Sequence, residues 1–328
     1  MTGGSGAHNV SRLMGASVCR MPGSVVEQLL GMRAGICRLN ARTGVRTALL
    51  YSSGWFVQWH EGTQEAVDDV WQRALTHPGH AHARVIHRSQ GVPGLTEPLH
   101  IASLHNRDKP TDVARRLLRI EREHELELDG EPAEMWNLLS APCMLEPRDT
   151  ALSVARRNVV AVTSEYTESV DLIKVIADRS RAPISYQRFA SGDAGEAGAA
   201  YVDVAGSGYM TRLQALSRRA LDNSMIKLSL CGMQSLVLLT GHRPHHASRL
   251  ATAVVGLLEG MAVRPNVRVI GSCAQTRAEA VNVLHGLPGL DIVEVESTRS
   301  SGALADTVLD AIGSCADTAR ARLDFLSA

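Results

Sequence analysis

The densest group of chemically versatile side chains is the run Thr240-Gly241-His242-Arg243-Pro244-His245-His246. It follows a predicted buried strand and precedes a predicted helix, so we expect it at the carboxyl edge of a sheet, where open α/β folds bind ligands. The histidines His242, His245 and His246 could ligate a metal ion or a haem. Because Pro244 separates them and no cysteine or carboxylate lies at ligand spacing beside them, we favour exposed loop histidines and predict no metal site.

A second set of polar residues could support enzyme chemistry at the same sheet edge. It consists of Thr163, Asp203 and His242, each near the end of a predicted strand. The sequence has no phosphate-binding loop of the Walker type, no dinucleotide fingerprint, no nucleophile elbow and no H-E-x-x-H zinc motif. No nucleophile–base pair can be identified, so an enzyme is the least favoured class of function.

Composition limits the remaining classes. The chain has 328 residues, 34 Lys+Arg and 34 Asp+Glu, which is a formal net charge of zero and a length suited to about two domains. Charge balance argues against a nucleic-acid-binding surface over the whole chain. No apolar run approaches the roughly 20 residues of a membrane helix, and the start does not resemble a secretory signal. Six cysteines without a CxxC pair indicate neither zinc nor a disulfide framework, so we expect a cytoplasmic protein with no membrane association.

The hydrophobic patterns predict two structured regions of different type. After a flexible tail over 1–9, residues 10–105 have the order βαββαββ, with Ser24 and Glu27 as a capping box and Ser52-Ser53-Gly54 as a hairpin turn. Two helices on one face of a mixed sheet are typical of a ferredoxin-like α+β domain.

Residues 106–150 are predicted as a charged linker helix and connector. Residues 151–328 alternate buried strands with helices, which predicts an α/β domain with a mainly parallel sheet flanked by helices. The expected strands are 158–162, 200–204, 234–239, 267–271 and 292–295, and the expected helices are 168–177, 211–221, 248–261, 278–284 and 303–311.

Several separated features of the first region coincide with one known family. The segments Leu39-Asn40-Ala41-Arg42-Thr43-Gly44, Ala48-Leu49-Leu50-Tyr51 and Trp55-Phe56-Val57-Gln58-Trp59-His60-Glu61-Gly62 resemble the BLUF family of blue-light sensors that use FAD. The resemblance covers about residues 10–105. It implies that Asn40 hydrogen-bonds the flavin edge, that Gln58 is the amide that switches its hydrogen bonds after light, and that Trp59 is a nearby signalling tryptophan. Ordinary structural roles also account for these three residues, and we favour those roles.

The departures from the family pattern concern its photochemistry. The resemblance implies an electron-donating tyrosine on the first strand, at or near Ala16, yet no tyrosine precedes Tyr51. Gly79-His80 stands where the family has an Arg-His pair, and Leu99 and Ile101 stand where it often has Trp and Met. We therefore expect a degenerate, light-insensitive BLUF-like module that most simply binds no cofactor, with FAD or haem as the alternatives.

These observations together favour a bacterial, cytoplasmic regulatory protein that signals by protein–protein interaction, for example with a transcriptional regulator. We expect a regulatory protein partner and no direct nucleic-acid binding, and a homo-oligomer is left open. The alternatives are a small-molecule sensor for flavin, haem or a nucleotide, and an enzyme with its site at the sheet edge of the second domain.

Overall fold

The structure is a computed structural model, and it describes residues 9–125, 131–140, 155–164, 166–191, 197–206, 209–223, 225–226, 230, 233–259, 261, 264–298, 300 and 302–311. The chain divides into two compact units, which are described separately below. Unit 1 comprises Met1–Met144, Gln187–Glu196 and Asn223–Cys231, and unit 2 comprises Leu145–Tyr186, Ala197–Asp222 and Gly232–Ala328. The expected flexible tail lies, except for Asn9, outside the described residues.

Unit 1 keeps the predicted order βαββαββ and then adds two helices. Its elements are β1 (Val10–Cys19), α1 (Val25–Thr43), β2 (Arg46–Ser52), β3 (Trp55–Gly62), α2 (Gln64–Thr76), β4 (His80–Gly91), β5 (Leu99–His105), α3 (Pro110–Glu125) and α4 (Pro132–Ser140). A strand from much later in the chain, β7 (Ile184–Ser191), contributes its last five residues to this unit. The resulting strand order is β7-β5-β2-β3-β1-β4.

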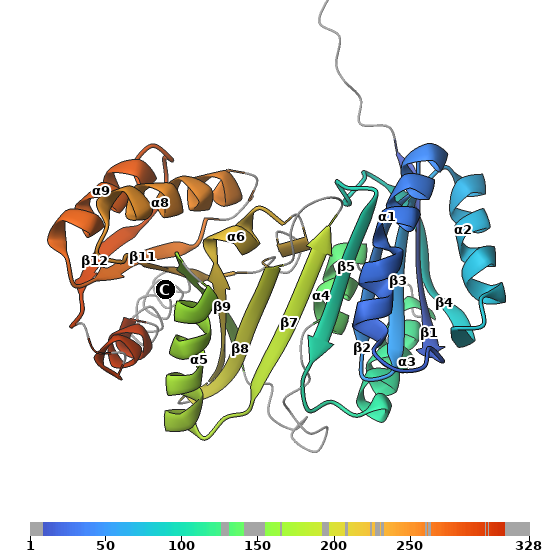
Figure 1. The fold of residues 1–328 in the computed structure, drawn as a ribbon, viewed down its shortest axis with the longest axis horizontal. Helices are drawn as coiled ribbons and strands as arrows, with labels where there is room; N and C mark the ends of the chain where they lie inside the picture. Colours follow the sequence, from blue (N-terminus) through green and yellow to red (C-terminus); the bar gives the residue numbers. More distant parts are fainter. Residues whose placement is uncertain are drawn as a thin grey trace, which may run out of the picture. The chain divides into compact units, whose positions relative to one another are not determined.

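Helices cover both faces of this sheet. In Figure 1, α1 and α2 lie on one face, which we call the front face, whereas α3 and α4 lie on the other, the back face. Side chains on a strand alternate between faces. Phe56 packs against α1, and Leu13 packs against α2, so Phe56, Gln58 and His60 of β3 belong to the front face. Trp55, Val57, Trp59 and Glu61 therefore belong to the back face.

Local turn chemistry explains how the elements begin and end. Ser53 and Gly54 have φ angles of 46° and 80°, so the predicted hairpin is closed by a two-residue turn with positive φ at both positions. Thr63 caps α2, since its hydroxyl accepts from the Ala66 amide at 3.3 Å. The predicted capping box at α1 is wrong, because Ser24 makes no side-chain cap and Gln28 instead donates to the Pro22 carbonyl.

The predicted connector over residues 106–150 is not a free linker where the structure describes it. Val113, Leu117 and Ile120 of α3 are at most 2% exposed, and α3 contacts β4. Arg116, also buried, pairs with Asp108 before the helix. Both α3 and α4 belong to unit 1 because their apolar faces cover the back of its sheet.

Unit 2 is a mixed sheet with helices. Its elements are β6 (Ala155–Thr163), α5 (Tyr166–Ser180), β8 (Ala197–Gly206), β9 (Tyr209–Ser217), α6 (Arg218–Leu221), β10 (Ser235–Leu239), α8 (Pro244–Leu258), β11 (Asn266–Gly271), α9 (Ala274–Leu284) and β12 (Ile292–Glu296), and residues 302–311 are also helical. The strand order is β12-β11-β10-β6-β9-β8. Neighbouring strands run parallel except β8 and β9, which are antiparallel.

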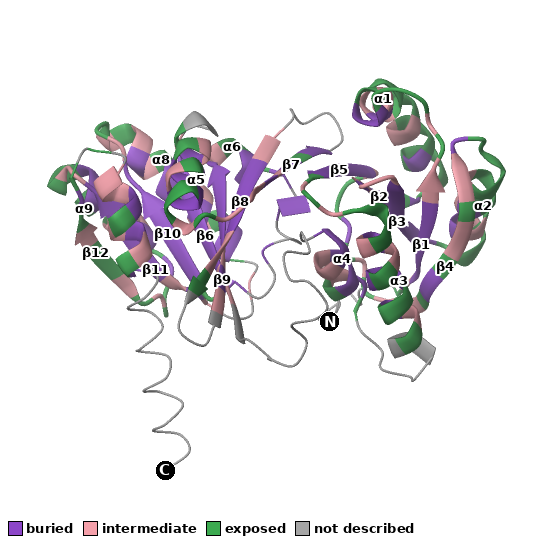
Figure 2. Cartoon of the chain, turned by 90° about the horizontal axis from the view of Figure 1, so that it is seen from below, coloured by how far each residue is buried: buried purple, intermediate pink, exposed green. Residues whose placement is uncertain are grey.

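Most buried residues of unit 2 lie on its strands (Figure 2). Val159 and Ala161 of β6 pack with α5 on one face, and Val160 and Val162 are equally buried on the other. The helix predicted over 211–221 is wrong except for α6. Leu213 and Leu216 have helical spacing, but residues 209–217 pair with β6 and β8 as the central strand β9. None of the described helices is long and apolar enough to cross a membrane.

Candidate functional site

Two paired strands bring polar side chains together on the front face of unit 1. In the antiparallel register of β1 and β3, Ser17 lies opposite Phe56, Gly15 opposite Gln58 and Leu13 opposite His60. Directly opposed residues of an antiparallel pair point to the same side of the sheet. The front face therefore places Ser17, Gln58 and His60 near one another beneath α1 and α2.

These side chains form a continuous hydrogen-bonded chain across the sheet. The Asn40 amide at the end of α1 donates to the Thr47 hydroxyl at 3.1 Å, and that hydroxyl lies 3.0 Å from His60 Nδ1. His60 Nε2 lies 3.2 Å from Gln58 Oε1, and Gln58 Nε2 lies 3.4 Å from His80 Nδ1. Five elements (α1, β2, β3, β4 and, through Ser17, β1) contribute to it.

The chain is anchored at both ends. At one end, Asn40 donates its second amide hydrogen to the Pro98 carbonyl at 2.9 Å. At the other, the Ser17 hydroxyl lies 2.7 Å from His80 Nδ1. Asn40, Thr47, Gln58 and His60 are each at most 6% exposed, so water has little access to these bonds. A chain of this kind holds the elements of the front face in one arrangement.

With both rings neutral, one assignment of protons fits the chain of hydrogen bonds. Since Asn40 and Gln58 donate through nitrogen, His60 Nδ1 accepts from Thr47 and its Nε2–H donates to Gln58 Oε1, while His80 Nδ1 accepts from Gln58 and Ser17. The accepting Nδ1 keeps His80 neutral, and a neutral His60 fits the same bonds. Burial agrees, because it lowers the pKa of His60 to about 3 and that of His80 to about 4, with further lowering from Arg73 and His77 respectively.

We expect the protein to lose stability as the pH falls below about 6.5. His60, His80 and the buried His100, whose pKa burial lowers to about 4, stay neutral in the folded chain and take up protons on unfolding. The unfolded state then binds more protons, which lowers the free energy of unfolding by up to about 1.4 kcal/mol per pH unit for each such histidine. Urea denaturation at pH 7, 6 and 5 measures this slope.

The substitution His60→Gln removes one histidine that takes up a proton on unfolding. The decrease of the free energy of unfolding with falling pH should therefore be smaller by up to about 1.4 kcal/mol per pH unit. His285→Gln, at an exposed position of α9's C-terminal end, is the matched control and should leave the slope unchanged. Equal slopes for all three proteins would show that His60 is already charged in the folded state.

Ala16 points away from the hydrogen-bonded side chains of the front face. A photoactive tyrosine was expected at or near this position. Ala16 is paired with Val57, so it lies on the back face, fully buried. The β1 residues on the Gln58 side are Gly15 and Ser17. Gly15 lies opposite Gln58, and Ser17 bonds to His80, so neither β1 position on this face carries an aromatic ring.

An indole of the protein lies over the glycine opposite Gln58. Trp71 of α2 is 4% exposed and packs with Leu13 and Val67. A Cβ added to Gly15 would overlap the Cη2 and Cζ3 atoms of this ring and lie 3.1 Å from Cε3. The six-membered ring of Trp71 therefore rests on the backbone of β1, next to the Gln58 carboxamide. Phe56 lies beside the other end of the chain, with its ring centroid 4.9 Å from that of His80.

Trp59 does not join Asn40 and Gln58. It is on the back face, 1% exposed, with its ring centroid 6.4 Å from that of Trp136 in α4. The neighbouring back-face residue Glu61 accepts hydrogen bonds from the Gly94 and Leu95 amides at 2.9–3.0 Å and so holds the segment before β5. Of the three residues that the resemblance assigned, the structure brings together two.

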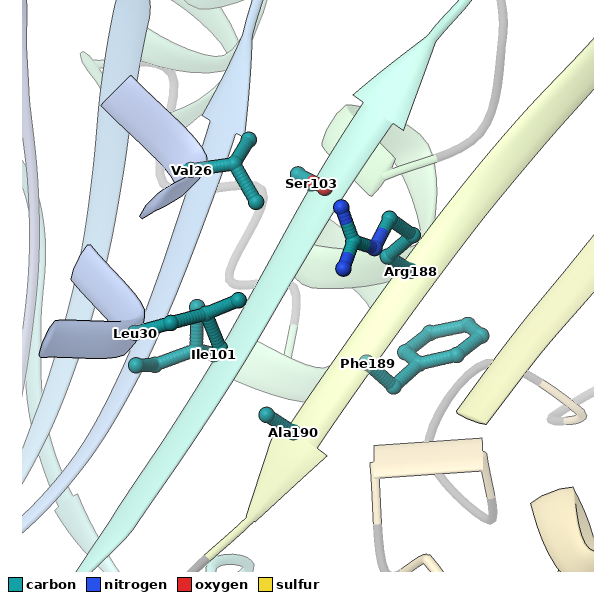
Figure 3. Close-up of a pocket in the computed structure, with 7 residues that line it drawn as sticks. All are labelled: Val26, Leu30, Ile101, Ser103, Arg188, Phe189 and Ala190. Atoms are coloured by element: carbon teal, nitrogen blue, oxygen red, sulfur yellow. The ribbon is translucent and has the colours of Figure 1, made fainter. Parts of the chain in front are cut away.

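A small cavity of unit 1 lies between α1, β5 and β7. Val26, Leu30, Ile101, Ser103, Arg188 and Ala190 are among its lining residues, and Figure 3 shows the Arg188 guanidinium directed toward Ser103. Its volume of about 10 Å³ is about that of one water probe. It is too small for an organic ligand.

The histidine loop of unit 2 is divided by a helix start. His242 is exposed in the loop after β10, whereas His245 and His246 lie in the first turn of α8, with ring centroids 4.2 Å apart. Within the described ranges, no group of three or more His, Cys, Asp or Glu side chains could hold a metal ion. The three histidines are not gathered around a common point.

The residues considered for catalysis are also separated. Thr163 and His242 follow the neighbouring parallel strands β6 and β10 and share one sheet edge. Asp203 instead forms a two-bond ion pair with Arg212 on β9, with both distances 2.9 Å. Arg212 is five residues before Ser217, the partner of Thr163, which corresponds to roughly 16 Å along a strand. The three side chains do not form one site.

Four members of the front-face chain of hydrogen bonds were not predicted from the sequence: Ser17, Thr47, His60 and His80. His60 could have been found, because it is two residues from Gln58 on a strand and must share its face. Thr47, Ser17 and His80 depend on the register of β2, β1 and β4, and no local pattern contains that information.

Comparison with known proteins identifies the first unit. Residues 11–93 match the family model described as BLUF, sensors of blue-light using FAD, and no family model matches the second half. No curated protein matches the chain. Among solved structures, the chain is similar to the BLUF protein BlrB in its dark state (24% identity, TM-score 0.27, covering 38% of this chain and 88% of that one).

Two further solved structures are similar at lower identity. They are photo-activated BlsA (17% identity, TM-score 0.30, covering 40% of this chain and 92% of that one) and Klebsiella pneumoniae BlrP1 in a manganese and cyclic-di-GMP complex (14% identity, TM-score 0.28, covering 89% and 76%). The family match rests on the segment that carries β1–β4, Asn40 and Gln58. Residues 11–93 are therefore a BLUF domain, a signalling module of the blue-light sensor family.

Proposed function

We propose that this chain is a cytoplasmic regulatory protein whose BLUF domain no longer responds to light and acts through contact with a regulatory protein partner, such as a transcriptional regulator. The observation that carries the proposal is that β1 has no aromatic side chain on the face it shares with Gln58. Gly15 lies opposite Gln58, and Ser17, opposite Phe56, bonds through its hydroxyl to His80. Neither glycine nor serine can donate an electron to an excited flavin.

We further infer that the module works without a bound cofactor. The two residues that the resemblance assigns to flavin, Asn40 and Gln58, already bond to Thr47, Pro98, His60 and His80. A ligand that used these amides would have to break those bonds, including the one between Gln58 and the fully buried His60. Leaving a buried polar group without its partner costs about 1–3 kcal/mol. The residues present do not fit a flavin ring without rearrangement.

Two segments from the second half of the sequence belong to the same compact unit as the BLUF domain. Gln187–Glu196 and Asn223–Cys231 belong to unit 1 although the sequence on both sides of each belongs to unit 2. Met225 and Ile226 are fully buried, and Ala190 packs with Val25 and Leu29 of α1. A substitution in either of these later segments can therefore alter the core of unit 1 directly.

The absorption spectrum of the full chain purified in darkness tests the proposal first. We expect no flavin or haem band and no spectral change under blue light. A flavin band that shifts under light would contradict light insensitivity, and a stable haem or flavin band without a light response would favour the small-molecule sensor instead.

Affinity capture of the tagged chain from its own cells, in parallel in darkness and under blue light, tests the partner. We expect the same specific protein in both samples, in stoichiometric amounts. A complex that forms in only one light condition, or no complex at all, would contradict a light-independent regulator that acts by protein contact.

A further inference from the structure

Trp71 covers the β1 residue that lies opposite Gln58. Its six-membered ring rests on Gly15, and Gly15 is the residue directly opposite Gln58 in the β1–β3 register. Any side chain at residue 15 would overlap this ring. Because Gly15 has no Cβ, the indole of Trp71 can pack directly on the front face of the sheet.

The front face also carries polar groups that could bind a planar heteroaromatic ring. Hydrogen bonds link the Gln58 and Asn40 amides with the imidazoles of His60 and His80 through Thr47, and Phe56 lies beside His80. Carboxamides of this kind can donate and accept in the plane of a ring. In this structure the Gln58 and Asn40 carboxamides make their hydrogen bonds within the protein, and the Trp71 indole of α2 covers Gly15 on the front face.

We propose that this BLUF domain retains a flavin-binding site that is blocked, and that Trp71 is the residue that excludes flavins from it. The ligand class is a flat, hydrogen-bonding heteroaromatic ring such as a flavin. The inference rests on the proposed cofactor-free module and names the side chain responsible for it. It concerns ligand binding alone, so it can fail while light-independent partner binding remains true.

Truncation of the buried indole would open a cavity on the order of 150 Å³, which is room for one ring of a flavin. Trp71→Ala would remove the whole indole from Gly15, the residue opposite Gln58. The hydrogen bonds that Gln58 and Asn40 make within the protein can then be replaced by hydrogen bonds to the ligand.

The back face offers a matched control. Trp136 of α4 is completely buried and packs against Trp59 on the opposite side of the sheet, where neither Gln58 nor Asn40 points. Trp136→Ala removes the same indole and destabilises the protein comparably, but opens its cavity away from the polar groups of the front face. Any gain of flavin affinity caused by general loosening would appear in both variants.

The experiment titrates lumiflavin and FAD separately into the full chain, with quenching of flavin fluorescence and thermal shift as readouts. Wild type and Trp136→Ala should show no saturable binding, whereas Trp71→Ala should bind lumiflavin at least about tenfold more tightly than either, equivalent to about 1.4 kcal/mol. If Trp71→Ala is poorly folded by circular dichroism, Trp71→Leu should give a smaller gain in the same direction.

Three results would overturn the inference. Saturable flavin binding by the wild type would show that Trp71 does not block the flavin-binding site. Equal affinities in the Trp71→Ala and Trp136→Ala proteins would show that loosening, not the indole over Gly15, governs access. Folded Trp71→Ala and Trp71→Leu proteins without any gain would show that other side chains exclude the ring.

Discussion

The substitution Ala190→Asp is expected to lower the free energy of unfolding of the whole chain by about 4 kcal/mol or more. Ala190 is 2% exposed and packs into the cluster of Val25, Leu29, Phe56 and Ile101. A carboxylate there has no partner among these apolar side chains and costs several kcal/mol to bury. Urea denaturation measures the loss, and hydrogen exchange should show it at the amides of α1 and β5.

The same introduced charge at an exposed alanine of the same packing layer provides the control. Ala34 lies on the solvent side of α1, and Ala34→Asp should cost less than about 1 kcal/mol through helix propensity alone. If Ala190→Asp cost no more than this control, or if the loss of protection were limited to unit 2, β7 would not be part of the BLUF-domain core.

The second large effect is expected at Glu61. Replacing it with alanine should destabilise the protein by about 3 kcal/mol, because the Gly94 and Leu95 amides lose their carboxylate acceptor. The effect should extend to the front face, since the same loop ends at Pro98, whose carbonyl accepts from Asn40. Urea denaturation measures the loss, and hydrogen exchange at the loop amides locates it.

Glu61→Gln separates the hydrogen bonds from the charge. Burial raises the pKa of Glu61, while the Leu95 and Gly94 amides and then Arg12 and Arg46 oppose the rise. The amide variant keeps one acceptor oxygen and should lose about half as much stability as Glu61→Ala. The exposed Glu65→Ala should lose about 0.5 kcal/mol, as a charge at a helix start does. Equal losses in the alanine variants at 61 and 65 would contradict the role of Glu61.

Much of the architecture of unit 1 follows from local signals in the sequence. The hairpin required residues that tolerate positive φ, and Ser53-Gly54 provided them. The N-cap of α2 at Thr63 and the helix end at Gly44, with φ of 70°, are equally local. The capping box at Ser24 did not form, because the Ser24 side chain makes no cap hydrogen bond.

What could not be predicted depends on pairing between distant segments. β9 has apolar residues at spacings that suit a helix, and only its position between β6 and β8 makes it a strand. β7 was missed because it completes a sheet whose other strands end about eighty residues earlier. The assignment of Trp59 to the flavin side could have been avoided, since a residue next to Gln58 on a strand must point to the other face.

The interleaving of the two units also sets the order in which the growing polypeptide can fold on the ribosome. When Met144 has been made, β5 is still an open sheet edge, because the strand that covers it ends at Ser191. At roughly 5–20 residues per second, the edge waits several seconds for β7, and longer for the buried Met225 and Ile226. An open edge is a template for pairing with another chain. Neighbouring ribosomes on one message would present such edges to one another, so slow translation between residues 144 and 231 should lower the yield of native protein.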